Sequence, residues 1–487
     1  MKKSTYFSIP LIVLLSVIFF AIVQCTSETR YSESVEQKIK KVENSLAEWY
    51  QTQAKERWTL AERMKLFHVN GLCIAVIHDH TMEWVRGYGL ADTSEKRPVT
   101  GKTLFQAASV SKSFNAIGVL KLVQDKKLDL SRDINDYLIT WKFPYDSVSH
   151  NKLITTAALL SHTAGLTIHG FPGYAAGDTI PTLTQILDGR RPANTEAIRS
   201  MTVPGAKVIY SGGGVTISQM IIMDITRMPY DEYMQKNVLD PLGMKSSSFT
   251  QPPDKSKGSL LATGYKGDGK EVKGKYHIYP EQAAAGLWTN PADLCKYIIG
   301  TQLSYNGESS KVLTPEMTKL RLTPVLEDAA LGVFIWKKGD LKYFSHNGGN
   351  EGFTCQYIGC LDNGEGVVIM TNSDNGAILE EIVNSVATVY GWKDYYQPVI
   401  KNVVEVSESV IEKYVGKYEA EGVKVNFKMS GKELFADPGN DQLWKVNFTS
   451  DSDFFLKEYR ADFRFQTDAH GKVKGFTANG MPVKKVE

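Results

Sequence analysis

The chain has 487 residues, of which 23% are charged, and its 56 basic and 54 acidic residues give a formal net charge of +2. This ordinary composition predicts a globular protein and excludes wholesale disorder. No long block of basic residues is present, so nothing indicates a nucleic-acid or anionic partner. The length exceeds the size at which one hydrophobic core usually stops growing, and two domains are therefore expected.

The first 25 residues differ from the rest of the chain. Lys2 and Lys3 precede an apolar run from Ile9 to Val23, which is shorter than the ~20 apolar residues of a spanning helix. We interpret residues 1–25 as a secretory signal peptide of an exported bacterial protein, periplasmic or membrane-anchored. Cys25 stands where a bacterial lipoprotein signal places its lipidated cysteine, so lipoprotein anchoring, ordinary cleavage and an uncleaved anchor all stay open.

The remaining cysteines are too few for a disulfide scaffold in so long a chain: Cys73, Cys295, Cys355 and Cys360. If the stretch around Cys355 and Cys360 is a strand, their odd separation puts them on opposite faces. We therefore expect buried free thiols. No Cys-x-x-Cys or His-Glu-x-x-His spacing is present, so neither a metal site nor another cofactor is predicted.

The mature chain should begin with a helix and a hairpin. Strands are expected at 72–77 and 82–87, joined by a turn at 78–80. Before them, residues 27–68 carry apolar side chains at helical spacing, which predicts one amphipathic helix: Ile39, Val42, Leu46 and Trp49.

Helices dominate the middle of the chain and strands return after it. A largely buried helix should begin close to Ser109 and run to Lys127, with further helices at 217–226 and 230–239. Strands at both ends around a helical insertion predict an α/β (α+β) fold, with an antiparallel sheet flanked by helices and a helical subdomain. The later elements are expected as strands at 330–336, 341–345, 353–360 and 366–370, and a closing helix at 380–390.

A second, smaller domain should follow a linker at 392–406. Val423, Val425, Phe427 and Met429 alternate with polar residues, which is the periodicity of a half-buried strand. Further short apolar runs are separated by turn residues. Residues 407–487 are therefore predicted to form a small all-β domain, an open barrel or a sandwich.

The spacing of Ser109 and Lys112 has a chemical meaning on a helix. Positions i and i+3 share a face, and a serine at a helix N-terminus lies near free backbone N–H groups. A lysine held in a partly dehydrated site loses its proton more easily and can act as a base. Taken alone, this spacing fits an ordinary surface helix better than an active site. The residues on both sides are apolar, however, which indicates a buried helix, and a lysine on a buried helix needs a reason.

Two later segments add polar groups beside glycines. Tyr210 precedes three glycines, and a phenol near a cationic lysine can have a lowered pKa and act as an acid or a base. The alternative is a core tyrosine above a flexible loop. The segment His346-Asn-Gly-Gly349 follows a predicted strand, where glycine N–H groups can bind an oxyanion. The alternative is a hairpin turn.

In this order, the three segments resemble the motifs of the serine β-lactamase and penicillin-binding protein superfamily. The tyrosine in the second motif resembles class C β-lactamases, DD-carboxypeptidases and related esterases. Leu159-Leu-Ser-His-Thr-Ala-Gly-Leu166, Pro241-Leu-Gly-Met244 and Ala285-Gly-Leu-Trp288 also look like that family. The resemblance covers roughly residues 35–390, so a hydrolase domain is expected at 35–392.

The resemblance implies a role for each matching residue. Ser109 would be acylated, with Lys112 and Tyr210 transferring protons. The backbone N–H groups of Ser109 and Gly349 would form the oxyanion hole. His346 would place a substrate carboxylate or support Tyr210. The remaining substrate-binding residues would be Asn347, Gly348 and Gly212.

Two departures from the family pattern bear on the substrate. Gly212 stands where the family usually has an asparagine that binds the acyl amide, and His346 stands where β-lactamases have a lysine. Both favour an esterase, peptidase or amidase acting on a small molecule or a short peptide or ester, rather than a true β-lactamase. A non-hydrolytic cell-wall or β-lactam sensor, and an assembly factor working through its terminal β domain, are the alternatives.

Overall fold

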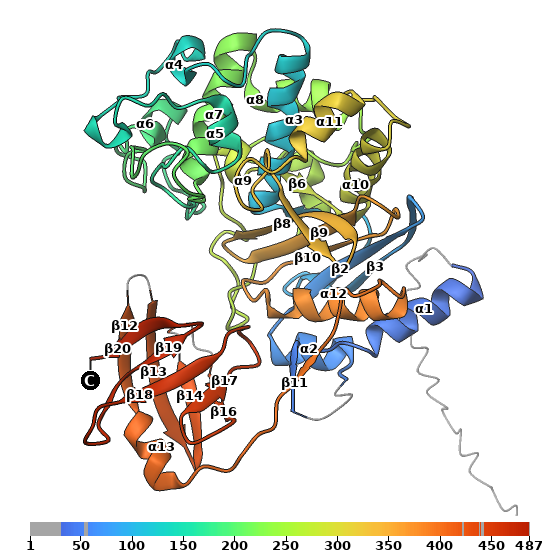
Figure 1. The fold of residues 1–487 in the computed structure, drawn as a ribbon. Coiled ribbons are helices and arrows are strands. Elements are labelled where there is room, and N and C mark those ends of the chain that lie inside the picture. Colours follow the sequence, from blue (N-terminus) through green and yellow to red (C-terminus); the bar gives the residue numbers. More distant parts are fainter. Residues whose placement is uncertain (1–30, 53–56, 421–422, 438, 440–442, 487) are drawn as a thin grey trace, which may run out of the picture.

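The computed structural model describes residues 31–52, 57–420, 423–437, 439 and 443–486, so the predicted signal peptide and Cys25 lie outside the described residues. A seven-stranded antiparallel sheet forms the centre of the larger, N-terminal domain, in the order β4-β3-β2-β10-β9-β8-β7 (Figure 1). Its strands are β2 (Gly71–His78), β3 (Thr81–Asp92), β4 (Arg97–Pro98), β7 (Phe334–Lys338), β8 (Leu341–Asn350), β9 (Phe353–Cys360) and β10 (Gly366–Thr371).

The sheet joins the two ends of the domain, as predicted. Strand β2 pairs with β10 in antiparallel register, with Ala75 opposite Val368. The predicted hairpin is present, since β2 also pairs with β3 across a turn at Asp79 and His80. The predicted strand at 330–336 begins only at Phe334, where pairing of β7 with β8 starts. The expected fold class is therefore confirmed.

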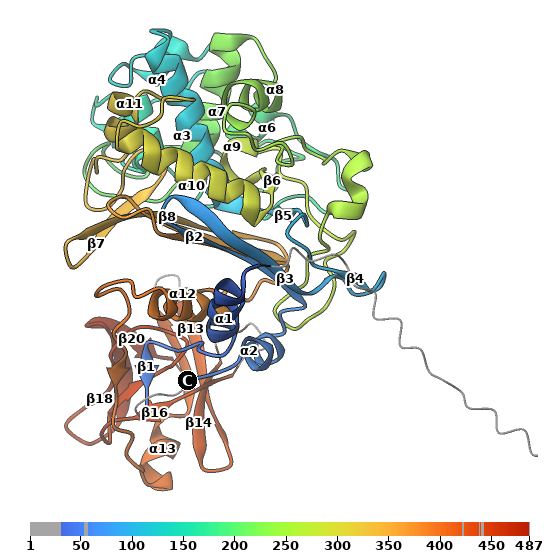
Figure 2. The ribbon, with the colours of Figure 1, turned by 90° about the vertical axis from the view of Figure 1, so that its right-hand side faces the viewer.

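Helices cover both faces of the sheet, so each face has its own hydrophobic core (Figures 1 and 2). In β9, Cys355 packs in the core beneath the helical subdomain, and Cys360 packs in the core beneath the terminal helices. This alternation follows from the two-residue period of a strand. All four described cysteines are buried free thiols, as predicted.

Three helices from the two ends of this domain lie on one face of the sheet. The first two take the place of the single helix predicted over 27–68, which is wrong. They are α1 (Glu33–Glu43), α2 (Leu60–Leu66) and α12 (Ala377–Val389). The first ends because the backbone N–H of Asn44 turns back to the carbonyl groups of Lys41 and Val42. A capping box at Thr59 then starts α2. The chain between them includes β1 (Tyr50–Gln51), parallel to β11 (Val399–Ile400).

The other face carries the helical subdomain. Its first long helix follows a 3₁₀ turn at Ala108–Val110, so the helix predicted near Ser109 is confirmed, but it ends at Gln124. The three glycines after Ser211 form the first turn of a helix and not a loop. The helices are α3 (Ser111–Gln124), α4 (Ile134–Tyr137), α5 (Thr156–Leu160), α6 (Leu183–Leu187), α7 (Gly212–Thr226), α8 (Tyr230–Met234), α9 (Gln282–Ala285), α10 (Pro291–Tyr305) and α11 (Pro315–Arg321).

Two short strands and several single turns complete this domain. Strand β5 (Phe105–Gln106) pairs with β6 (Trp288–Thr289) just before the turn that carries Ser109. A π-helical turn at Gln235–Leu239 extends α8, so the helix predicted over 230–239 is present in two forms.

The C-terminal domain is a curled all-β sheet preceded by α13 (Glu408–Tyr414). Its sheet order is β15-β14-β13-β12-β20-β19-β18-β17-β16. The two edge strands are neighbours in sequence, so the sheet nearly closes on itself around an aromatic core. The predicted small all-β domain is confirmed. Its strands are β12 (Gly416–Ala420), β13 (Val423–Ser430), β14 (Glu433–Asp437), β15 (Trp444–Lys445), β16 (Asn447–Phe448), β17 (Asp453–Phe455), β18 (Phe463–Thr467), β19 (Val473–Ala478) and β20 (Met481–Lys485).

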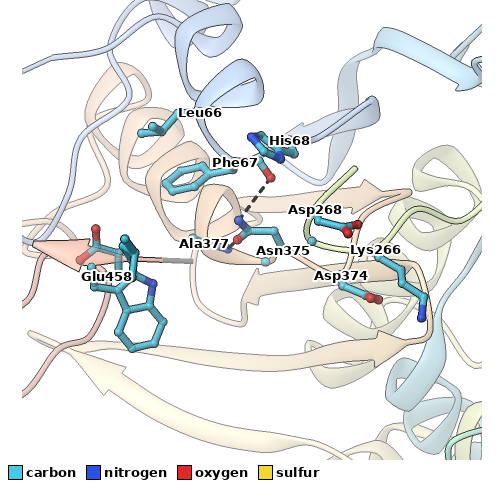
Figure 3. Close-up of a pocket in the computed structure, with 13 residues that line it drawn as sticks. Leu66, Phe67, His68, Lys266, Asp268, Asp374, Asn375, Ala377 and Glu458 are labelled. Carbon is cyan, nitrogen blue, oxygen red and sulfur yellow. Dashed lines mark hydrogen bonds between the residues drawn. The ribbon is translucent and has the colours of Figure 1, made fainter. Parts of the chain in front are cut away.

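The two domains meet beside α2 and the start of α12. Arg63 bonds to both Glu48 and Glu381, and Lys457 of the C-terminal domain lies 3.1 Å from Glu48. Next to this buried network is an interdomain cavity of about 690 Å³, in which Asn375 donates to the carbonyl oxygen of Phe67 (Figure 3). The cavity is lined by residues 66–68, 266–268, 374–377, 443, 444 and 458.

Candidate active site

Ser109 and Lys112 lie one turn apart where the 3₁₀ turn passes into α3. The Nζ atom of Lys112 lies 2.9 Å from Oγ of Ser109 and donates a second hydrogen bond, 2.8 Å long, to the carbonyl oxygen of Ala284. Lys112 is only 2% exposed. Burial disfavours the ammonium form and lowers the pKa of Lys112 to about 7. A neutral amine is thus accessible near neutral pH, within hydrogen-bonding distance of the hydroxyl group that it would deprotonate.

Tyr210 completes a group of three side chains. Its phenol interacts with the side chain of Ser109, and its ring centroid lies 5.0 Å from Nζ of Lys112. Burial raises the pKa of Tyr210 to about 12, so the expectation of a lowered phenol pKa is wrong. The main cause is desolvation of the phenol itself, and burial of Lys112 also favours its neutral form, which cannot stabilise a phenolate. Lys112 is therefore the group that can be a base, while Tyr210 stays protonated.

Aromatic rings hold Tyr210 in place. His162 lies against it with ring centroids 4.2 Å apart, and its Nδ1 accepts a hydrogen bond from the backbone N–H of Ser211. Phe334 and His169 also contact the tyrosine ring, with centroids 6.4 and 4.8 Å away. His162 therefore fixes the ring of Tyr210 from behind.

His346 lies behind the site and not in it. It is 2% exposed, its ring centroid is 6.2 Å from that of Tyr210, and its Nδ1 donates to the carbonyl oxygen of Asn347 at 2.6 Å. Burial lowers the pKa of His346 to about 3, so the imidazole is neutral. A neutral buried ring cannot form an ion pair with a substrate carboxylate. Of the two roles considered for His346, this placement favours support of Tyr210.

The last residues of β8 run alongside the turn that carries Ser109. A Cβ atom on Gly348 would lie 2.3 Å from the carbonyl oxygen of Ala107, so only glycine allows this close approach. A Cβ atom on Gly349 would meet nothing within 4 Å, so this residue borders open space. Asn350 fixes the end of the strand by donating to Gln106 at 2.8 Å and to the carbonyl oxygen of Ala285 at 3.1 Å.

Six of the eight sequence-predicted site residues line one cavity of about 520 Å³: Ser109, Lys112, Tyr210, Asn347, Gly348 and Gly349. His346 and Gly212 lie behind its wall. The described residues that line it all come from the hydrolase domain. The rest of the wall was not predicted from the sequence: residues 169–171, Ala284, Ala285, Phe334 and Asn350. The only sequence signal for 169–171 was Gly170-Phe-Pro-Gly173, which indicated a turn.

Neither a metal cluster nor a spanning helix is found in the part of the chain that the structure describes. No three His, Cys, Asp or Glu side chains come together there as a metal site. Among the same residues, no helix is long and apolar enough to cross a membrane.

Together, the antiparallel sheet, the helical subdomain and the Ser–Lys–Tyr group define a serine hydrolase of the β-lactamase and penicillin-binding protein type. The sequence profile of the Beta-lactamase family matches residues 59–383, and the chain belongs to that family. The resemblance inferred from the three motifs is thereby confirmed.

Curated relatives match part of the chain. Protein flp of Staphylococcus aureus (strain N315) is 26% identical over 235 residues, which cover 47% of this chain and 45% of that protein. A Beta-lactamase of Pseudomonas fluorescens is 28% identical over 243 residues, covering 49% of this chain and 62% of that protein. The chain thus spans about half the length of the curated relatives it matches.

Solved structures show the same fold at low identity. The octameric penicillin-binding protein homologue from Pyrococcus abyssi has a TM-score of 0.59 and 21% identity, over 88% of this chain and 98% of that chain. The D-amino acid amidase from Ochrobactrum anthropi SV3 has a TM-score of 0.54 and 23% identity, over 68% of this chain and 96% of that chain.

Proposed function

We propose that this protein is an exported serine hydrolase that cleaves an ester, amide or peptide bond through an acyl-enzyme on Ser109. One observation carries the proposal: Nζ of the buried Lys112 lies 2.9 Å from Oγ of Ser109, and both residues line an open cavity. Burial has a large cost for a lysine, and a catalytic base is a physical reason to accept that cost.

The chemistry follows from the positions of the three side chains. Lys112 takes the hydroxyl proton of Ser109 as Oγ forms a bond to the substrate carbonyl carbon. Tyr210 lies beside both Ser109 and Lys112, so its hydroxyl group can pass a proton to the leaving group and recover one from Lys112. The leaving group departs with that proton. A water molecule then attacks the acyl carbon, the bond between that carbon and Oγ breaks, and a proton of the water passes through Lys112 and Tyr210 to Oγ of Ser109.

The negative oxygen of the tetrahedral intermediate needs hydrogen-bond donors. We assign this role to the backbone N–H groups of Ser109 and Gly349, because both residues line the cavity and Gly349 borders open space. The substrate is a small molecule or a short peptide or ester. Export is proposed from the basic residues and the apolar run within residues 1–25.

A covalent probe tests the proposal directly. The purified protein would be incubated with a fluorophosphonate, and the adduct located by mass spectrometry, with Ser109→Ala as the control. We expect one adduct, on Ser109, and none in the variant. The absence of any Ser109-dependent adduct would refute the catalytic proposal. If an adduct with a labelled penicillin persisted for hours, the protein would instead be a sensor that acylates without turnover.

A further inference from the structure

The space that a side chain at position 212 would occupy is filled by another part of the chain. A Cβ atom on Gly212 would lie 3.0 Å from the carbonyl oxygen of His169 and 3.2 Å from the ring of Phe171. The backbone N–H of Gly212 also donates to that carbonyl oxygen, at 3.0 Å. A side chain from the start of α7 therefore cannot reach the cavity, and the segment 168–171 forms the wall there.

This wall is held in one conformation. Ile168 has a φ of 62°, which a β-branched residue adopts only under constraint. The constraint is the cap of α7: the carbonyl oxygen of Ile168 accepts from Gly213 at 3.0 Å and from the hydroxyl of Ser211 at 3.3 Å. Further along, the carbonyl oxygen of Pro172 lies 2.9 Å from Nδ1 of His277. The backbone strain is thus balanced by contacts that fix His169 and Phe171 at the cavity.

Aromatic rings form much of the cavity wall, Asn347 and Asn350 add amide side chains, and the wall carries little charge. Phe171, Phe334, Tyr210 and the ring of His169 line the cavity. Lys112 is the one Lys or Arg among the described residues that line it, and its Nζ is already engaged by Ser109 and Ala284. A substrate carboxylate entering this cavity would lose water without gaining a permanent cation as partner.

We propose that the segment Ile168–Phe171 makes this site select uncharged substrates whose acyl group is apolar or aromatic. Such a substrate has no amide beside the scissile carbonyl group and no carboxylate on its leaving group. This inference rests on the proposed function, because it concerns which acyl groups Ser109 accepts. It assigns Phe171 and His169 as specificity-determining residues.

A matched pair of esters tests the acyl side. In p-nitrophenyl hippurate, an amide replaces two methylene groups of p-nitrophenyl 4-phenylbutyrate, and the two are otherwise alike in length and ring. The rate constant for acylation of Ser109 would be measured for each by p-nitrophenol release and by mass spectrometry, and divided by the rate of the same ester with a simple alkoxide, because the amide of hippurate activates its ester. We expect 4-phenylbutyrate to react about tenfold faster, since a buried amide would lack a partner on the α7 side. A preference for hippurate would overturn the proposal.

A second pair tests the leaving group. The 3-carboxyphenyl and 3-carbamoylphenyl esters of 4-phenylbutyrate differ by a charge at nearly constant shape. Each acylation rate would be divided by the ester's own rate of alkaline hydrolysis, which removes the difference in intrinsic reactivity. The uncharged carbamoyl ester is expected to react about tenfold faster. Faster acylation by the carboxylate ester would show a cationic subsite and would contradict the inference.

Variants connect the preference to the segment. Phe171→Ala should lower the ratio of the 4-phenylbutyrate rate to the acetate rate about tenfold, because the phenyl group loses an apolar surface. The matched control, Ile180→Ala, removes a 38% exposed apolar side chain of the same region and should leave both rates unchanged. An unchanged ratio in Phe171→Ala would refute the role of the segment. Labelling of Ser109 by fluorophosphonate without acylation by either ester would refute the substrate class and leave the proposed hydrolase intact.

Discussion

Replacing Lys112 by methionine should strongly reduce activity and yet stabilise the protein near neutral pH. The pKa of Lys112 is lowered from 10.5 to about 7 by burial. Since one pKa unit corresponds to ~1.4 kcal/mol, burying this amine costs the folded state about 4 kcal/mol at pH 7. Methionine removes that cost but leaves the carbonyl group of Ala284 without its donor, a loss of about 2 kcal/mol. The net expected gain at pH 7 is therefore about 2 kcal/mol.

The pH dependence of this gain is the sharper part of the prediction. Between pH 7 and 10.5 the unfolded chain binds a proton at Lys112 that the folded protein has lost. The stability of the wild-type protein relative to Lys112→Met must therefore rise with pH, by about 1.4 kcal/mol per unit between roughly pH 7.5 and 10. Below pH 7 the difference should be constant. The two proteins should become equally stable at about pH 9. There the remaining cost of burying the amine in the wild-type protein equals the free energy of the hydrogen bond that the variant lacks.

Urea denaturation of both proteins at several pH values between 6 and 9.5 measures the difference in free energy of unfolding. Lys112→Arg is the control, because a guanidinium group keeps its charge at every pH and should be both inactive and less stable. Acylation of Ser109 in Lys112→Met should fall about 10²- to 10⁴-fold, the usual contribution of a general base. A variant less stable than wild type at pH 7, or a difference that does not change with pH, would refute the assignment of Lys112 as a buried neutral base.

Three further predictions concern the same site. The value of kcat/KM for an uncharged ester should rise tenfold per pH unit below pH 7 and level off above it, as Lys112 loses its proton; a midpoint near 10 would contradict the burial argument. Tyr210→Phe should lower kcat about 10²-fold or more with little change in the unfolding midpoint, measured by steady-state kinetics and calorimetry; unaltered kcat would remove the phenol from the mechanism. Gly348→Ala should lower the free energy of unfolding by about 1–3 kcal/mol, because the new Cβ atom would overlap the carbonyl oxygen of Ala107. Gly349→Ala should lower it by less than about 0.5 kcal/mol. Equal losses of the two variants in urea denaturation would show that the close approach of β8 is not required.

Much of the fold was predictable because its patterns are local. Strand β9 begins and ends where the apolar run does, since turn residues bound it on both sides. The two-residue period of that strand also placed Cys355 and Cys360 on opposite faces before any partner strand was known. Over residues 27–68, by contrast, the helical spacing of apolar residues predicted one helix where the structure has two. Leu46 and Trp49 keep helical spacing and are buried, but the chain there has already left α1.

For the candidate site, the sequence by itself determined the Ser109–Lys112 pair and the order of the three motifs, because spacing on a helix and adjacency to glycine are properties of short segments. The tertiary structure decided what these groups can do. The pKa of Tyr210 goes up and not down, because burial depends on residues such as His162 and Phe334 that come from distant parts of the chain. Likewise, the missing side chain at Gly212 is replaced by Phe171, about forty residues earlier. Spacing fixes which atoms are neighbours along one element, whereas solvation and the shape of the cavity depend on every element that packs around it.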